Sequence, residues 1–144
     1  MVEPAVADPG AAYHAAQDAA LRGSSALAAL WPNGVARIYS VAPHNAPLPY
    51  LIIGDDQILE DSDDCVSASE INSNVHVWTK PEPPDVQLGR QIAGLVRSIL
   101  ADAGLPISGF DLVLAQFVDA RHLTDPDGSS HAVLAFRYLV TAIP

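Results

Sequence analysis

The chain has 144 residues, of which 49% are apolar and only 6% are aromatic. This length predicts one domain over residues 1–144, and the apolar content excludes a wholly disordered chain. Seven basic against 17 acidic side chains give a formal net charge of -10, which disfavours a protein that binds nucleic-acid phosphates. The single cysteine, Cys65, excludes an internal disulfide and a cysteine-pair zinc site.

The N-terminal segment 1–9 carries acidic residues and prolines, where an export signal would need a basic start and an apolar run. We expect this segment to be a flexible arm. No apolar run in the chain approaches the roughly 20 residues of a membrane-spanning helix. The sequence therefore predicts a soluble protein that is made in the cytoplasm and has no membrane partner.

Helical signals open the chain. The Asp-Pro-Gly sequence at 8–10 is typical of a helix start, and apolar residues then recur at helical spacing as far as Gly23. Ser24 can cap a shorter helix over 26–31, which ends at a Pro-Asn-Gly turn. The N-terminal quarter is therefore predicted to be helical.

The middle of the chain alternates between strand and loop signals. The three prolines of segment 42–49 predict a surface loop or arm, because proline cannot join a central ladder. The carboxylates of segment 54–64 predict an acidic turn. Around these loops, branched and aromatic residues predict four strands, over 35–41, 50–53, 66–71 and 74–79.

The strand predicted over 74–79 has a definite pattern of faces. Its side chains alternate, so His76 and Trp78 are expected on one face and Val75 and Val77 on the other. The proline-rich segment 81–84 ends this strand and separates it from the clearest helical pattern of the chain.

Apolar residues from Leu88 to Ala103 fall on one face of a helix that Asp85 can cap and Gly104 can end. Two long strands, over 110–122 and 132–143, then flank a turn signature with proline second and glycine fourth, Asp125-Pro126-Asp127-Gly128. This order of elements predicts an α+β fold. Its sheet is mainly antiparallel, and the N-terminal helix and the long amphipathic helix pack on it.

Six carboxylates lie within segment 54–64. Such a group could bind Ca²⁺, but Cys65 and Val66 stand where an EF-hand needs a ligand and a glycine. A solvated acidic loop, a divalent-ion site and a repulsive surface remain as alternatives, and we assign no metal ligand. The six residues are Asp55, Asp56, Glu60, Asp61, Asp63 and Asp64.

The sequence contains no phosphate-binding loop, nucleophile elbow or metalloprotease template. Asp119, Arg121 and Asp125 could act as acid, base and anchor, yet the same residues are ordinary in cross-strand and turn contacts. Because neither a nucleophile nor a cofactor motif supports catalysis, we expect no enzyme, no catalytic residue and no cofactor.

The remaining chemically active side chains have ordinary structural interpretations. None of the five histidines pairs with another at metal-ligand spacing, although the fold could bring two together. Trp31 and Trp78 could stack on a ligand or partner, but in an alanine-rich chain they are expected in the core. Cys65 is expected to be an inert thiol.

An ordered set of short motifs is spread over about residues 11–143. The set consists of the alanine-rich opening helix, Arg37-Ile38-Tyr39, Pro47 to Gly54, His76-Val77-Trp78, the amphipathic helix, and Arg121 to Gly128 with His131 to Arg137. Its most specific piece is Leu123-Thr124-Asp125-Pro126-Asp127-Gly128, followed by an aromatic strand. As a whole, the set resembles one family: the small tail-completion or tail-terminator proteins of long-tailed phages and gene transfer agents. The sequence departs from the family in its longer N-terminus and in segment 69–74.

The resemblance implies a structural subunit of a virion or virion-like particle, assembled in the bacterial host cytoplasm. Such a subunit forms a homo-hexameric ring on the end of the tail tube, halts polymerisation of the tube protein, and faces the head–tail connector. DNA passes through the ring without specific binding. Carboxylates suit such a channel because they repel phosphates, whereas basic groups would hold them, so the acidic segment is expected at the channel or an exposed rim.

Three other functions stay open at the level of the sequence. Another neck component, an adaptor or a stopper, would share the location and the symmetry. An acidic inhibitor could imitate DNA and occupy a nuclease or repressor. A small enzyme could assemble its site from distant residues, of which Asp119, Arg121 and His131 would be the first to test.

Overall fold

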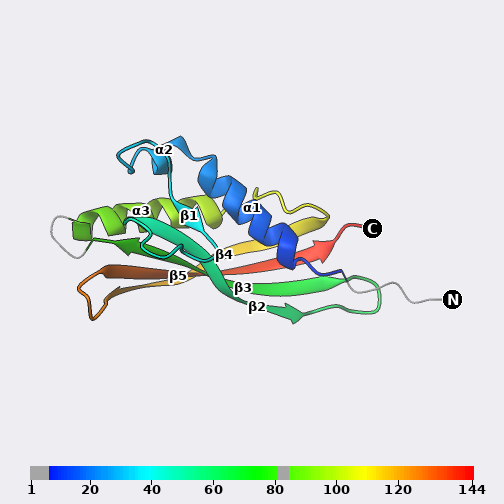
Figure 1. The fold of residues 1–144 in the computed structure, drawn as a ribbon. Coiled ribbons are helices and arrows are strands. Elements are labelled where there is room, and N and C mark those ends of the chain that lie inside the picture. The colour runs from blue at the N-terminus through cyan, green and yellow to red at the C-terminus, as the bar shows by residue number, and fades with distance from the viewer. Residues whose placement is uncertain (1–6, 81–84) are drawn as a thin grey trace.

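The computed structural model describes residues 7–80 and 85–144 of the chain. Its helices and strands, in chain order, are α1 (Gly10–Arg22), α2 (Ser25–Ala28), β1 (Ile38–Tyr39), β2 (Tyr50–Glu60), β3 (Ala68–Thr79), α3 (Asp85–Leu100), β4 (Phe110–Thr124) and β5 (Ser130–Ala142). Figure 1 shows the strands as one twisted layer and the helices gathered on one side of it. The α+β class predicted from the sequence is therefore confirmed.

The sheet has the strand order β1-β2-β3-β5-β4. The short β1 pairs in parallel with β2, at Ile38↔Leu51 and Tyr39↔Ile52, and the other neighbouring pairs among the described strands are antiparallel. β3 and β5 pair without a register shift from Ala68↔Thr141 to Thr79↔Ser130. Shifts occur instead in β2, at Gly54/Asp56, and at two places in β4.

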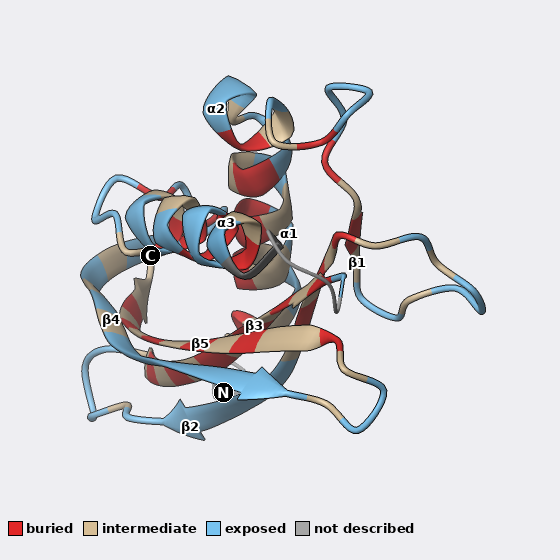
Figure 2. Ribbon diagram, turned by 90° about the vertical axis from the view of Figure 1, so that its left-hand side faces the viewer, coloured by how far each residue is buried: buried red, intermediate tan, exposed pale blue. Residues whose placement is uncertain are grey.

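The core lies between the sheet and the helices. Along β3 and β5, every second residue is buried, which is the period expected when one face of a strand is covered. Figure 2 shows buried segments in the strands and in α1 and α3, which lie over the sheet. The helix α3 contributes Ile92, Val96 and Leu100, each 0% exposed. Burial of each such side chain stabilises the fold by about 1.5–3 kcal/mol.

A buried hydrogen-bond network ties the helices to the sheet. The amide Nε2 of Gln17 in α1 donates to Ser73 Oγ of β3 and to Tyr138 Oη of β5, both at 3.1 Å. The Tyr138 hydroxyl donates in turn to the Leu100 carbonyl of α3, at 2.8 Å. Burial raises the pKa of Tyr138 to about 12, so this donor stays protonated at neutral pH.

The N-terminal helices agree with the sequence prediction except at their ends. The first runs over Gly10–Arg22, and the Ser24 hydroxyl caps the second by accepting from the Leu27 N–H at 3.1 Å. That second helix is shorter than predicted, since it ends at Ala28. Residues 1–6 of the expected arm and the proline segment 81–84 lie outside the described residues.

The four strands predicted in the middle of the chain were wrong in their bounds. The strand expected over 50–53 extends to Glu60 as β2. The strand expected over 35–41 shrinks to Ile38–Tyr39, because β1 has a partner only there, and its flanks Val35 and Val41 are 61% and 85% exposed. The strands expected over 66–71 and 74–79 form one strand, β3. Its polar residues 72–74 stay in the ladder because β2 and β5 pair with them from both sides.

The hairpin predicted between the last two strands is present. The Gly128 N–H donates to the Asp125 carbonyl at 2.8 Å, and Gly128 has a φ of 88°. This positive φ is the conformation that glycine adopts without a side-chain clash, so the turn signature specifies the turn directly. Among the described residues, no helix is long and apolar enough to cross a membrane.

Candidate functional site

The face of the sheet that the helices leave uncovered carries a row of rings. His76 and Trp78 of β3 point to this face, while Val75 and Val77 are buried on the other, as the alternation predicted. The register places Tyr50 of β2 beside Trp78, and His131 of β5 on its other side. We call Tyr50, His76, Trp78 and His131 the ring row.

Stacking holds the ring row together. The rings of Trp78 and His131 are stacked, with centroids 3.7 Å apart and planes at 13°. Tyr50 lies 6.4 Å from Trp78, and Tyr39 of β1 meets Tyr50 edge-on at 5.9 Å. Trp78 was expected in the core and is instead half-buried on the uncovered face, because the strand alternation assigns it to the side of His76.

The two histidines of the row contact one another and two carboxylates. His76 Nδ1 lies 2.8 Å from His131 Nε2, and His76 Nε2 lies 2.9 Å from Asp55 Oδ2. At the far end, His131 Nδ1 lies 3.8 Å from Asp125 Oδ1. These four residues, which we call the histidine chain, connect the bulge of β2, β3, β5 and the β4–β5 turn.

The two short contacts of the histidine chain have hydrogen-bond length, and the tautomers of the two rings decide which nitrogen donates in each. The 3.8 Å between His131 Nδ1 and Asp125 Oδ1 is longer than a hydrogen bond. Burial, with His76 nearby, lowers the pKa of His131 below its ordinary value. The His131 ring is therefore uncharged at neutral pH.

The six acidic residues singled out in the sequence do not lie in one turn. Asp55, Asp56 and Glu60 belong to β2, which continues to Glu60 because β3 pairs with it, and Asp61, Asp63 and Asp64 lie in the loop beyond. The acidic turn predicted for 54–64 was therefore wrong in its position. All six residues are exposed, so their charges need no buried partner.

Three of these carboxylates have local roles. Asp55 sits at the β2 bulge with a φ of 56° and contacts His76. Asp56 accepts a hydrogen bond from the Tyr13 hydroxyl of α1. Asp63 Oδ1 accepts from the backbone N–H groups of Cys65 and Val66, at 2.8 and 2.7 Å, and these bonds lower the pKa of Asp63. Asp63 thus shapes the loop.

The described part of the chain holds no group of three or more His, Cys, Asp or Glu side chains arranged to bind a metal ion. The acidic residues are divided between a strand and a loop, and Cys65 is an exposed free thiol. The calcium alternative therefore has no assembled site within residues 7–80 and 85–144.

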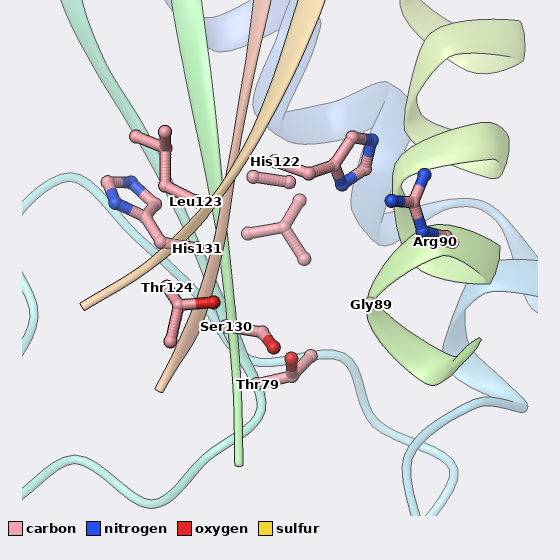
Figure 3. A pocket seen from close by; sticks show the side chains of 10 residues that line it. Thr79, Gly89, Arg90, His122, Leu123, Thr124, Ser130 and His131 are labelled. Carbon is pink, nitrogen blue, oxygen red and sulfur yellow. The ribbon is translucent and has the colours of Figure 1, made fainter. Parts of the chain in front are cut away.

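The residues weighed for catalysis are only partly brought together. Asp119 and Arg121 of β4 are exposed, while Asp125 lies in the turn near His131. A hollow of about 140 Å³ lies nearby, between α3 and the ends of β3, β4 and β5. In Figure 3 the His131 ring points away from this hollow, and His122 lies on the side of Arg90. Burial and the Arg90 charge lower the pKa of His122.

Comparison with known proteins gives the class of this protein, which is a structural component of virions. The chain matches the family described as "Tail completion protein gp17" over residues 18–141. It therefore belongs to the tail completion protein gp17 family, and it is a structural protein and not an enzyme. The resemblance stated from the sequence motifs is confirmed.

A solved structure supports the same assignment. The chain is 26% identical to a chain of the structure titled "Virion of native gene transfer agent (GTA) particle", with a TM-score of 0.79. The match covers 97% of this chain and 100% of the other. A search of curated proteins finds no match.

Proposed function

We propose that the chain forms a six-membered ring on the end of the tail tube, stops polymerisation of the tube protein and joins the tail to the head connector. The observation that carries the proposal is the family match over residues 18–141. The full-length likeness to a chain of a gene transfer agent virion supports it. The partners of this ring are further copies of the chain, the tube protein and a stopper or adaptor protein.

The ring leaves a channel for DNA, and we place the acidic residues at this channel or on an exposed rim. They are Asp55, Asp56, Glu60, Asp61, Asp63 and Asp64. Their exposure and the formal charge of -10 per chain support this placement, because carboxylates repel phosphates and would not hold DNA in transit. A structure of the ring with Asp61, Asp63 and Asp64 inside a subunit interface without cations would contradict it.

Removal of the chain from particle-producing cells tests the termination step. We expect tubes without a fixed length, with heads unattached, when the tails are measured by negative-stain electron microscopy. Tails of normal length without heads would instead show an adaptor or stopper. The matched control is the same cell line with the chain supplied from a plasmid, in which tail length and head attachment should be restored.

A further inference from the structure

The sheet has two open margins. β4 is its outermost strand on one side, and within the described part of the chain nothing pairs with the outer edge of β4. On the other side, β1 covers only Leu51 and Ile52 of β2. On that edge, the backbone groups of segment 54–60 therefore also have no strand partner among the described residues. Open edges of this kind are sites at which another strand can add.

Exposed apolar side chains gather on these same strands. Of the ten large apolar residues that are exposed in the described structure, six lie on β2 or β4. Figure 2 shows much of β4 as exposed ribbon. Neighbouring strands that cover such residues remove apolar surface from water. The six are Ile58, Leu59, Val113, Leu114, Val118 and Leu123.

The two margins are complementary in direction. β2, β3, β5 and β4 are antiparallel in turn, so β2 and β4 run in opposite directions. A copy related by rotation about an axis that runs along the strands keeps its strand directions, so its β2 would meet β4 as an antiparallel neighbour. Contacts between two different surfaces of one chain are heterologous, and they close into a ring when the rotation allows.

The two margins are also compatible in register and charge. Within one copy, the paired residues of successive strands align Glu60 of β2 with Leu112 of β4, and Asp56 of β2 with Phe117 of β4. Segment 112–118 of β4 carries no charged residue. Strand side chains stand above and below the sheet, so the carboxylates of β2 can still face the channel when the backbone edge is paired. Their neighbours on β4 would be uncharged, which avoids like-charge repulsion.

The register shifts add curvature where a closed sheet needs it. In the described part of the chain they occur only in the β2–β3 and β4–β5 ladders, while β3 and β5 pair without a shift. Bulges bend a strand and increase its twist, and they are common at sheet edges and barrel rims. In β4 the shifts leave out Val113 and Val118, which are 62% and 51% exposed.

We propose that β4 of one copy pairs with segment 54–60 of β2 in the next copy, so that a continuous antiparallel sheet runs around the ring. The occupant of each open edge is thus a second copy of this chain. This inference rests on the proposed function in one respect, because it takes the assembly to be a closed ring. It adds the surfaces that make the contact.

Cysteine cross-linking tests the contact. In a Cys65→Ser background, Leu59→Cys is combined with Val113→Cys or with Val118→Cys, and a short bis-maleimide reagent is applied. All three positions are exposed, so the core is left intact, and thermal melting checks the fold of each variant. The reaction is run on free protein at high concentration and on assembled particles. Controls are each single-cysteine variant and the off-margin pair Val35→Cys with Val113→Cys.

We expect only the β2–β4 pairs to give a ladder of covalent oligomers that ends at six copies. A dimer from Val113→Cys alone would show that β4 pairs with itself, and it would overturn the proposal. A six-fold ring in particles without cross-links from either pair would also overturn it, while leaving the proposed function intact. If the chain is absent from the tube end, the proposed function fails, and the ladder from free protein still decides the contact.

Discussion

At the scale of single residues, one buried amide connects the N-terminal helix to the sheet. The Gln17 side chain is 0% exposed and donates to both Ser73 and Tyr138. We predict that Gln17→Ala lowers the free energy of unfolding by about 2–4 kcal/mol, since it leaves a cavity and removes partners of buried hydroxyls. Urea denaturation measures this change.

A matched control is available in α3. Gln91 is exposed, so Gln91→Ala should change the free energy of unfolding by no more than about 0.5 kcal/mol. Equal effects of the two substitutions would show that the Gln17 network contributes nothing beyond helix propensity.

The histidines give the fold a pH dependence of known sign. The fold lowers the pKa of His131 and of His122 from the ordinary value of 6.5. At pH values between 6.5 and the lowered pKa values, the unfolded chain therefore binds more protons than the folded one. Stability is therefore fully present above pH 6.5 and is lost as the pH falls through this window. Thermal melting between pH 7.5 and 5.5 should show a decreasing midpoint.

Substitution identifies the groups responsible. A double variant, His122→Gln with His131→Gln, should flatten the decrease, whereas His44→Gln, at an exposed position, should leave it unchanged. A midpoint that rises on acidification in the unsubstituted chain would contradict the lowered pKa values of His122 and His131.

The sequence predicted the ring row only in part. Period-two alternation was enough to place His76 and Trp78 on one face, because it is a local property of a strand. The contact of His76 with His131 joins residues 55 positions apart, and it depends on the β3–β5 register. Nothing local specifies that register, so the pairing of two histidines remained an open alternative.

At the scale of elements, two glycines have opposite roles. Gly128 has a φ of 88°, so Gly128→Ala should lower the free energy of unfolding by about 1–2 kcal/mol. Gly94 lies in α3, where an added Cβ would meet nothing within 4 Å. Gly94→Ala should therefore raise the free energy of unfolding, by about 0.5–1 kcal/mol.

Denaturant unfolding of both variants checks this pair of predictions. Stabilisation by Gly128→Ala would contradict the turn geometry, and destabilisation by Gly94→Ala would contradict an open helix surface.

Strand bounds were predicted less well than helices and turns, for a physical reason. A helix or turn satisfies its hydrogen bonds locally, so capping and turn residues indicate it directly. A strand extends as far as its partner does. β2 therefore continues through the charged segment 55–60 because β3 lies beside it, while the strand-like segment 35–41 is reduced to two residues where its partner ends.

At the scale of the whole molecule, the proposed channel predicts an effect of charge on DNA transit. Asp61 and Asp64 are exposed and lie in the loop after β2. Replacing both by lysine should leave tail length unchanged but reduce DNA delivery by at least roughly tenfold, because lysines bind phosphates by releasing counterions. Transfer or infection titre measures delivery, and the double Asn variant is the neutral control.

Unchanged delivery in the double-lysine variant would show that these two residues do not face DNA. Altered tail length would instead connect the loop to the tube contact.

We propose that this chain closes the tube as a ring of six copies. Electron cryo-microscopy of intact particles, focused on the junction of tube and head, tests this proposal. We expect six copies of the α+β fold on the head-proximal end of the tube, surrounding an open channel. A tube end occupied by another protein, or a copy number other than six, would contradict it.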